Sequence, residues 1–453
     1  MLKSSDTIIA SATPCGISAL GVVRLTGPEA IDITDRLFRG KARLSTVASH
    51  TVHHGLVLRP ETREPIDEVL VTVFRGPNSY TGEDLVEISC HGNPYLLDLV
   101  TKTAIECGAR LARQGEFSRR ALLNGKLDLV QAEAVLDLAT ARGEWARKNA
   151  FQQLTGVLSR RVRETADLLT ALLMQVEANL DFPEDEVWQE LPALRTNIKN
   201  MIGQLTQLLA GADAGLVLRE GPRVVIVGRP NVGKSSLFNQ IVGQDRVIVT
   251  ELPGTTRDYV EENVRIGDHH FRIVDTAGLG WPGNEIESAG IQKTKELVEQ
   301  AQLLLVIFDL SRPASQADYD LADKVEGKRL VLVFNKSDLP RVLDRYSVIR
   351  RSPGGKDLEV SAKTGAGIED LKKEIVNQFT GLRPAEGFLI TRRRHIDALE
   401  KTRAALTRAI DQEYYETMAV ELRVALDALG ELVGKATPED VLNRIFAEFC
   451  VGK

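Results

Sequence analysis

A glycine-rich loop in the middle of the chain carries residue types that bind phosphate. Residues 228–236 have the sequence GRPNVGKSS and follow the apolar run 224–227. This order predicts a buried strand, a glycine loop and the start of a helix, which is the context that a phosphate-binding loop requires. Gly228 and Gly233 let the backbone turn, so that successive N–H groups and the helix N-terminus can face anionic oxygens.

Two side chains of this loop could act directly on a nucleotide. Lys234 would place a cation beside the β- and γ-phosphates, and the Ser235 hydroxyl would bind Mg²⁺. The same string of residues also arises by chance at the N-terminus of an ordinary helix. The motifs that follow it along the chain argue against this alternative.

Further motifs of a nucleotide site appear in order. The polar loop 254–258 offers threonine hydroxyls, of which Thr256 is the predicted Mg²⁺ ligand and sensor of the γ-phosphate. The apolar run 271–274 leads into Asp275-Thr276-Ala277-Gly278. The aspartate can hold Mg²⁺ through water, and the N–H of the glycine can meet the γ-phosphate.

The next motif, Asn335-Lys336-Ser337-Asp338, predicts the base. A carboxylate accepts hydrogen bonds from N1–H and the 2-amino group of guanine, whereas adenine has an acceptor at N1 and no 2-amino group. Asp338 therefore selects GTP over ATP, and Lys336 would pack its stem along the base. Residues 361–363 would complete the pocket with backbone donors to guanine O6.

Five ordered motifs on alternating strands and helices predict a doubly wound α/β P-loop GTPase domain at residues 218–380. The predicted nucleotide-binding residues are Asn231, Val232, Gly233, Lys234, Ser235, Ser236, Thr250, Thr255, Thr256, Asp275, Thr276, Ala277, Gly278, Asn335, Lys336, Asp338, Ser361, Ala362 and Lys363.

The residue after the D-x-x-G motif is unusual for a signalling GTPase. GTPases of the Ras type have a water-orienting glutamine there, but this chain has Leu279. A leucine can neither orient water nor stabilise charge. Glu287 is a candidate to orient the attacking water, and a solvated loop carboxylate is the alternative for this residue.

The remaining sequence predicts two other kinds of structure. Residues 1–118 alternate short β-like runs with turn signals and two helical stretches, which predicts an α+β domain. In 119–217 and again in 381–453, apolar residues recur every three or four positions, which predicts helices. One is a long helix with an apolar stripe from Leu158 to Leu180, and a second runs from about 192 to 209. At the closing helix, Thr437 is the predicted N-cap residue and Pro438 takes the first helical position. The two helical blocks could form one all-α bundle from which the GTPase domain protrudes as an insertion.

Two charged residues, Arg24 and Glu87, interrupt apolar strands of the first domain. They either alternate onto a solvated face or face a polar ligand pocket. The predicted strands of this domain are 7–10, 21–25, 55–58, 69–74 and 85–88, and the predicted helices are 28–38 and 94–107.

Composition limits the class of protein. A chain of 453 residues is too long for one core, and 43% hydrophobic with 26% charged residues is typical of a soluble protein. No apolar run approaches 18 residues and the start lacks a signal-peptide pattern, so we expect a cytoplasmic protein that does not enter a membrane. The net charge of −6 argues against broad coating of nucleic acid.

The four cysteines argue against a zinc site or a disulfide framework. They are widely scattered and form no C-x-x-C pair. They are Cys15, Cys90, Cys107 and Cys450.

Several segments outside the GTPase motifs are distinctive. They are Asp6-Thr7-Ile8-Ile9-Ala10, Ala12-Thr13-Pro14, Gly21-Val22-Val23-Arg24, GPNSYTGED at 76–84, Gly115-Glu116-Phe117-Ser118, Lys126-Leu127-Asp128, Asp181-Phe182-Pro183, Arg392-Arg393-Arg394-His395 and Phe449-Cys450-Val451-Gly452-Lys453. With them the chain resembles the bacterial tRNA-modification GTPase family MnmE, also called TrmE, over essentially its whole length.

The resemblance implies that residues 1–118 have the tetrahydrofolate-binding fold of aminomethyltransferases. Such a domain would bind 5-formyl-tetrahydrofolate or a related tetrahydrofolate and would mediate homodimer contacts. By motif, the residues that contact the folate are Arg24, Glu87, Lys126 and Lys453, which favours the pocket alternative for the first two. A glutamate can pair with the donor edge of the pterin, and cations can pair with the carboxylates.

The resemblance also implies hydrolysis of GTP that is activated by K⁺. Asn231 matches the asparagine that binds potassium in the family, and Thr250, Leu252 and Thr255 would supply further oxygens. A cation there can stabilise developing charge where another GTPase uses an arginine finger. Glu287 matches the catalytic glutamate of the family.

The resemblance further implies a partner, the flavoprotein MnmG, in a heterotetramer. Together they would add an aminomethyl-type (carboxymethylaminomethyl) group at C5 of the wobble uridine of certain tRNAs. Cys450 would then act as a thiolate nucleophile or redox group, or else be a small buried apolar side chain. The arginines at 392–394 would contact tRNA phosphates or partner acids, or form a solvated helix start.

Two alternatives of another class remain open. One is a ribosome-assembly GTPase that acts as an RNA-binding switch, although the sequence has no KH-like or strongly basic segment. The other is a regulatory GTPase whose helical arms bind a protein partner.

Overall fold

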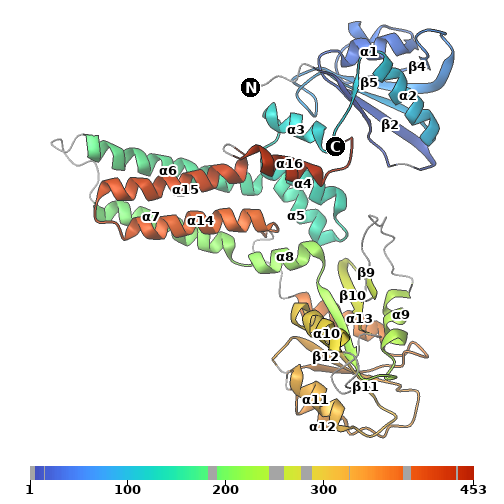
Figure 1. The fold of residues 1–453 in the computed structure, drawn as a ribbon, viewed down its shortest axis with the longest axis vertical. Coiled ribbons are helices and arrows are strands. Elements are labelled where there is room, and N and C mark those ends of the chain that lie inside the picture. Colours follow the sequence, from blue (N-terminus) through green and yellow to red (C-terminus); the bar gives the residue numbers. More distant parts are fainter. Residues whose placement is uncertain are drawn as a thin grey trace. The chain divides into compact units, whose positions relative to one another are not determined.

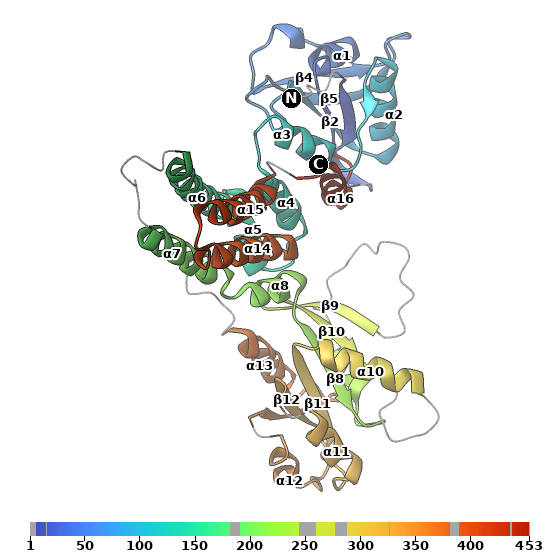
Figure 2. The ribbon, with the colours of Figure 1, turned by 60° about the vertical axis from the view of Figure 1, so that its left-hand side comes forward.

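The computed structural model describes residues 6–14, 16–181, 191–243, 260–276, 288–325, 327–352, 354–380, 389–434 and 437–452 (Figure 1, Figure 2). The chain forms two compact units. The first comprises Met1–Ala139, Phe151–Ile202 and Ala398–Lys453, and the second comprises Thr140–Ala150 and Gly203–Asp397. We describe each unit by itself.

The first unit contains a seven-stranded sheet in the order β3-β4-β5-β6-β2-β1-β7. All pairs are antiparallel except β1 with β7. Helices α1 and α2 bury one face of the sheet in a common apolar core. The elements are β1 (Ile8–Ser11), β2 (Ser18–Thr26), α1 (Ala30–Leu37), β3 (Phe38–Gly40), η1 (Leu44–Thr46), β4 (Thr51–Leu58), β5 (Pro65–Phe74), β6 (Leu85–Gly92), α2 (Pro94–Glu106) and β7 (Arg110–Leu111).

Strand β4 begins at Thr51, four residues before the strand predicted at 55–58. Its first four residues, Thr-Val-His-His, alternate between half-buried and exposed positions. Val52 is among the exposed ones, so the apolar residue points outward and the usual alternation of apolar-in and polar-out is reversed here. Antiparallel pairing with β5 extends the strand over these residues despite their composition.

The helices of the first unit are mostly long. They are α3 (Glu116–Leu123), α4 (Leu129–Thr140), α6 (Val157–Asp181), α15 (Tyr415–Val433) and α16 (Glu439–Ala447), and the two units share α5 (Glu144–Leu154), α7 (Leu191–Leu209) and α14 (Arg393–Ile410). Helices α6 and α15 lie side by side along much of their length (Figure 1, Figure 2). Phe446 and Phe449 of the C-terminal segment pack with Leu129 and Ala132 of α4.

One helical stretch of the described residues, Leu191–Glu220, is 30 residues long and apolar enough to cross a membrane by length and composition alone. A core helix of a soluble protein can meet the same criteria. Gly211, with φ of 85°, separates α7 from α8 (Ala212–Glu220), so the stretch is not one continuous helix. The expectation that the protein does not enter a membrane stays a prediction.

The second unit contains a six-stranded sheet in the order β13-β12-β11-β8-β10-β9. Every pair is parallel except β9 with β10. The elements are β8 (Arg223–Gly228), α9 (Lys234–Val242), β9 (Val260–Ile266), β10 (His269–Asp275), α10 (Ser288–Gln300), β11 (Leu303–Asp309), α11 (Gln316–Lys324), β12 (Leu330–Asn335), α12 (Arg345–Ile349), β13 (Lys356–Glu359) and α13 (Ile368–Thr380).

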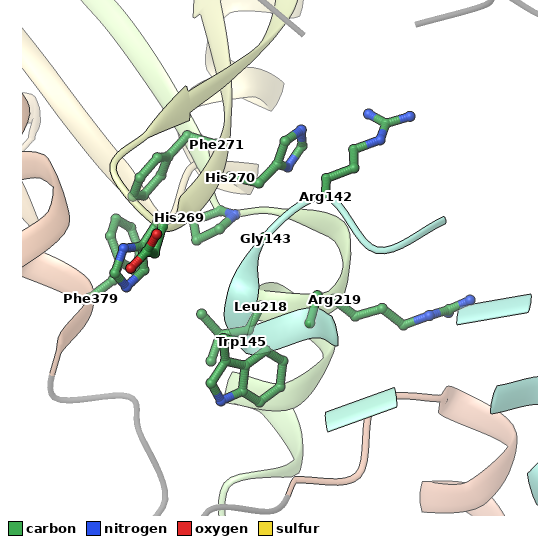
Figure 3. Close-up of a pocket in the computed structure, with 12 residues that line it drawn as sticks. Arg142, Gly143, Trp145, Leu218, Arg219, His269, His270, Phe271 and Phe379 are labelled. Atoms are coloured by element: carbon green, nitrogen blue, oxygen red, sulfur yellow. The ribbon is translucent and has the colours of Figure 1, made fainter. Parts of the chain in front are cut away.

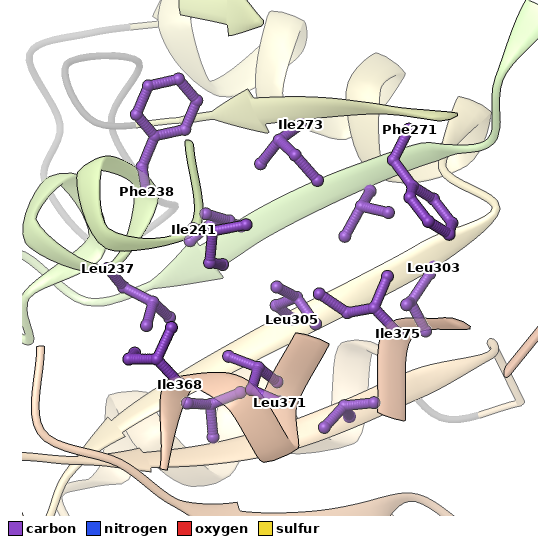
Figure 4. Close-up of a cluster of buried hydrophobic side chains, with 14 of the residues drawn as sticks. Leu237, Phe238, Ile241, Phe271, Ile273, Leu303, Leu305, Ile368, Leu371 and Ile375 are labelled. Atoms are coloured by element: carbon purple, nitrogen blue, oxygen red, sulfur yellow. The ribbon is translucent and has the colours of Figure 1, made fainter. Parts of the chain in front are cut away.

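Helices cover both faces of this sheet. The buried side chains of α9 and α13 pack on one face, as Figure 4 shows, and those of α10, α11 and α12 pack on the other. After β8 the chain forms β9 and β10 on one side of β8, and then β11, β12 and β13 on the other side, so the strand order reverses at β8. In open α/β sheets, ligands bind at the carboxyl ends of the strands beside such a reversal.

The predicted fold class is confirmed. The chain combines an α+β N-terminal part, an α-helical part and an α/β P-loop domain inserted between helical segments.

Candidate nucleotide site

The loop between β8 and α9 lies at the point where the strand order reverses. β8 ends at Gly228, and α9 starts at Lys234 with Gly233 as its N-cap residue. Gly233 has φ of 100°, and a Cβ atom there would lie 2.2 Å from Nδ2 of Asn335. Position 233 therefore requires glycine for both its backbone conformation and its close neighbour.

The Lys234 ammonium group lies against the backbone of its own loop. Nζ donates to the carbonyl oxygens of Gly228 and Arg229, both at 2.9 Å. Burial lowers the pKa of Lys234, and the nearby charge of Asp275 partly opposes this change. The loop thus carries a fixed cation at the N-terminus of a helix, an arrangement that attracts phosphate.

Oxygen ligands suited to Mg²⁺ lie beside this cation. Ser235 and Ser236 are exposed in the first turn of α9. Asp275 is 5% exposed at the end of β10 and pairs in register with Ile226 of β8. The next residue, Thr276, donates from Oγ1 to the carbonyl oxygen of Ile226 at 2.7 Å. A hydroxyl and a carboxylate are the donor types that Mg²⁺ prefers, so the residues present fit this ion.

Asn335 joins three segments of the site. Its side chain is buried, with Nδ2 donating to the carbonyl oxygen of Val232 at 2.8 Å. Its Oδ1 accepts from the N–H of Ala362 at 2.9 Å. One amide therefore joins the phosphate loop to the two base-reading loops, which are residues 335–338 and 361–363.

Asp338 is exposed at the mouth of the base pocket. The Ser361 hydroxyl donates to Oδ1 of Asp338 at 2.6 Å. This hydrogen bond holds the pKa of Asp338 below its ordinary value, and Lys363 and Lys336 add to the effect. The carboxylate is therefore ionised at neutral pH, as acceptance of two guanine donors requires.

Two contacts of the site involve residues that the sequence motifs do not include. Lys336 donates from Nζ to Oδ2 of Asp309 at 2.6 Å. Arg229 donates from Nη1 to Ser315 and Asp318, which form the capping box of α11. For Asp309 a signal was present in the sequence, because this acid directly follows the apolar run 303–308, and the residue after a buried parallel strand lies at the ligand edge of the sheet.

In the first unit, Arg24 and Glu87 are direct cross-strand neighbours on β2 and β6. Nε and Nη2 of Arg24 donate to Oε1 of Glu87 at 2.9 and 2.6 Å. The guanidinium group also lies 5.7 Å from the ring centre of Tyr80 and 5.8 Å from that of Phe117. Both side chains are mostly buried, so neither alternates freely onto a solvated face.

The C-terminal segment reaches this ion pair. The carbonyl oxygen of Gly452 accepts from Nη1 of Arg24 at 3.4 Å. Gly452 has φ of 102°, and a Cβ atom there would lie 2.2 Å from the carbonyl oxygen of Ser11. Cys450 is exposed, so its alternative interpretation as a buried apolar side chain is wrong. Lys126 is also exposed, with Nζ donating to the carbonyl oxygen of Pro77 at 3.1 Å.

Comparison with known protein families gives two matches that together span most of the chain. Residues 7–126 match the family model for the GTP-binding protein TrmE N-terminus, and residues 129–450 match that for the MnmE helical domain. The chain belongs to the MnmE family. The resemblance stated from the sequence is thus confirmed.

Three relatives that align with this chain along nearly their whole length share the same description. The tRNA modification GTPase MnmE of Thermoanaerobacter pseudethanolicus is 38% identical, that of Geobacillus kaustophilus 40% and that of Moorella thermoacetica 41%. Each alignment covers 99% of this chain and 99% of the relative.

Part of the predicted site lies outside the described residues. This holds for the segments on either side of β9 and β10 and for the last residue of the chain. The predicted residues concerned are Thr250, Leu252, Thr255, Thr256, Ala277, Gly278, Glu287 and Lys453, and Leu279 and Cys15 also belong to this group.

The three consecutive arginines at the start of α14 differ from one another. Arg392 is 8% exposed and Arg393 is exposed, forming an ion pair with Asp397 at 2.8 Å. The predicted solvated helix start therefore applies to Arg393 and not to Arg392.

A cleft of the second unit lies near the first residues of β8 and β10, at the end of these strands that is opposite the phosphate loop. It is lined by Trp145, Leu218, Phe271 and Phe379, with Arg142 and His270 at its polar side (Figure 3). Burial lowers the pKa of His270 to about 4, and the charges of Arg142 and Arg272 add to the effect. The histidine is therefore neutral at neutral pH.

Proposed function

We propose that the protein is a potassium-activated GTP hydrolase that acts in tRNA modification. With the flavoprotein MnmG it would add a carboxymethylaminomethyl group at C5 of the wobble uridine of certain tRNAs, with a tetrahydrofolate as the one-carbon donor. The observation that carries GTP binding is the joining of the phosphate loop to both base-reading loops through Asn335. Full-length relatives described as tRNA modification GTPases support the pathway.

Each nucleotide-site residue has a proposed role. Lys234 would contact the β- and γ-phosphates, and Asp338 would accept from guanine N1–H and the 2-amino group. Ser235 and Thr256 would hold Mg²⁺, which neutralises phosphate charge when bound. Glu287 would orient the attacking water, because the position used by the glutamine of Ras-type GTPases holds Leu279.

Potassium would bind beside the phosphate loop. Asn231 supports this part of the proposal, since its side chain is exposed and its φ of 63° turns the backbone within the loop. Thr250, Leu252 and Thr255 would complete the ligand set with oxygens. A cation at this point would stabilise charge that develops on the phosphates during hydrolysis.

The folate would bind where Arg24 and Glu87 meet the C-terminal segment. The carboxylate of Glu87 can accept from a pterin, while Arg24, Lys126 and Lys453 can pair with folate carboxylates. The two rings beside Arg24 add apolar surface of the kind that ligand pockets use. Cys450, which is exposed and is followed by three residues, would act as a thiolate or redox group in the chemistry. We propose that the protein is cytoplasmic and acts as a homodimer that assembles with MnmG into a heterotetramer.

The first experiment compares GTP hydrolysis in KCl and in NaCl at equal ionic strength for the wild type, Asn231→Ala and a control, Asn239→Ala. Asn239 is exposed on α9 outside the loop. We expect stimulation by potassium in the wild type and the control, but not in Asn231→Ala. Equal rates in both salts would remove the proposed activation and favour a switch protein.

The second experiment titrates 5-formyl-tetrahydrofolate by calorimetry. Arg24→Ala and Glu87→Ala should each weaken binding, whereas Arg36→Ala, on the exposed side of α1, should not. Binding that is unaffected by both substitutions would contradict the folate site. Complete absence of binding would instead favour a ribosome-assembly or regulatory GTPase.

A further inference from the structure

We propose that Asp309 is a positioning residue of the nucleotide site that holds Lys336 against both the base-reading loop and the phosphate loop. The inference rests on the proposed binding of guanine nucleotide. It assigns a role to a residue that belongs to none of the GTPase motifs.

Asp309 lies at the ligand edge of the sheet. It is the last residue of β11, and it pairs in register with Asn335 at the end of β12. β11 also pairs with β8, the strand that leads into the phosphate loop. Asp309 therefore lies between the end of β8, which leads into the phosphate loop, and the end of β12, which leads into the base-reading loop 335–338. The residue is 8% exposed.

The two carboxylate oxygens of Asp309 accept hydrogen bonds from different residues. Oδ1 accepts from the N–H and the hydroxyl of Ser311, at 2.9 and 2.6 Å. Oδ2 accepts from Nζ of Lys336 at 2.6 Å. Ser311 therefore fixes the orientation of the carboxylate, and the other oxygen is left to hold the lysine.

The charge of Asp309 persists despite its burial. Burial by itself would raise the pKa of Asp309, but hydrogen bonds from Lys336 and Ser311 outweigh it and hold the pKa below its ordinary value. Arg312 does little to orient this carboxylate, because its Nε lies 3.8 Å from Oδ2 of Asp309 and its side chain is 73% exposed. Lys336 is thus the main cation that this carboxylate orients.

Lys336, which Asp309 holds in place, also contacts the phosphate loop. Its Nζ donates to the carbonyl oxygen of Asn231 at 3.0 Å. Asn231 and Lys336 have φ of 63° and 64°, and they are two of the four non-glycine residues with positive φ in the described part of the chain. Such conformations persist only where surrounding contacts impose them. Asp309, Lys336 and Asn231 form a continuous chain of contacts that joins these two strained residues.

The arrangement predicts lower affinity without altered base selection. Lys336 would pack along any purine base, whereas Asp338 would distinguish guanine by its 2-amino group. Asp309 touches Lys336, and the hydrogen bonds described for Asp338 and Ser361 do not involve it. Loss of the Asp309 charge should therefore weaken binding of GDP and IDP by the same factor.

The test measures binding of fluorescent GDP, and competition by IDP, to the full chain. Asp309→Asn should raise the Kd for GDP about tenfold, which is the size expected for loss of a charge-assisted hydrogen bond. The ratio of the IDP and GDP dissociation constants should stay at the wild-type value. The matched control is Asp323→Asn, which removes an exposed ion pair with Arg351 in the same domain and should change neither quantity.

Two further variants separate positioning from a local structural role. Ser311→Ala removes the hydroxyl contact to Oδ1 and should change the Kd for GDP much less than Asp309→Asn. In a Lys336→Ala background, Asp309→Asn should have no further effect, because the residue acts through that lysine. If Asp309→Asn does not fold, Asp309→Glu replaces it with the same expected direction.

The outcomes distinguish this inference from the function on which it rests. A wild-type chain that binds no guanine nucleotide would overturn the proposed GTPase itself. Normal wild-type binding with Asp309→Asn equal to Asp323→Asn would overturn only the role of Asp309. The same holds if the effect persists in full without Lys336, or if the ratio of IDP to GDP affinity changes.

Discussion

Replacement of Asn335 with alanine should uncouple the phosphate loop from the base-reading loops. The Asn335 side chain is 2% exposed and makes two hydrogen bonds, one to the carbonyl oxygen of Val232 and one from the N–H of Ala362. The first of these spans 103 positions of the chain. No other side chain among the described residues makes both contacts.

The magnitude follows from the two partners that the substitution leaves unpaired. An unsatisfied buried donor or acceptor costs about 1–3 kcal/mol, so two of them cost about 2–6 kcal/mol. The site opens to water at the ligand edge, so we expect the lower part of that range. A nucleotide must restore the arrangement when it binds, and a loss of about 2 kcal/mol corresponds to about a 30-fold rise in the Kd for GDP.

The assay is a titration with fluorescent GDP, combined with thermal unfolding of the same samples. Asn377→Ala is the control, because Asn377 is exposed on α13 of the same domain. Asn335→Ala should raise the Kd and lower the unfolding temperature, while the control should change neither. A Kd within about threefold of wild type would refute the claim that this amide holds the loops together.

Three other substitutions have defined outcomes. Asp338→Asn should shift preference from GTP toward XTP in a competition assay, and unchanged GTP affinity would contradict the base-pocket assignment. Gly452→Ala should release the C-terminal segment, because φ of 102° and the contact with Ser11 exclude a side chain. Hydrogen exchange of the backbone N–H of Gly115, which donates to the carbonyl oxygen of Cys450, should then become faster, and an unchanged exchange rate would count against the docked segment. His270 has its pKa lowered to about 4, mainly by burial, so the unfolded state binds its proton first and stability should fall as pH drops from about 6.5 through about 4. His270→Gln should flatten this decline in thermal unfolding temperature, and parallel pH profiles of variant and wild type would refute the assignment.

Continuous motifs and periodic stretches could be predicted from the sequence. The apolar run 224–227 is the centre of β8, and the apolar stripe from Leu158 to Leu180 lies within α6. The predicted helix 192–209 corresponds to α7, which starts one residue earlier. In each case the signal comes from neighbours along the chain, and local periodicity records which face is buried.

The end of the chain shows a local prediction that was wrong in detail. Thr437 was expected to cap the last helix with Pro438 at its first helical position. The helix begins at Glu439 with Pro438 as the N-cap residue, and the Thr437 hydroxyl donates to the carbonyl oxygen of Glu431 instead. A threonine has several backbone partners within reach, and the sequence does not decide among them.

Contacts between distant segments could not be predicted from periodicity. Arg24 and Glu87 are 63 positions apart and meet only because β2 and β6 pair in one register. The sequence marked each residue as out of pattern but left open whether they face solvent or a pocket. Register depends on the burial of whole strand faces, so a single charged residue cannot reveal its partner.

Contacts between distant segments also explain why the sequence of residues 228–236 alone could not exclude an ordinary helix start. Position 233 needs glycine not only for its φ of 100° but also because the amide of Asn335 occupies the space of a side chain. That amide is held in turn by Ala362, and the carbonyl oxygen of Asn231 is held by Lys336, which Asp309 orients. An ordinary helix N-terminus would carry none of these constraints. The glycine loop is therefore one part of an arrangement whose other parts come from the ends of β11 and β12 and the loop after β13, and this mutual dependence explains why the motifs occur together in one domain.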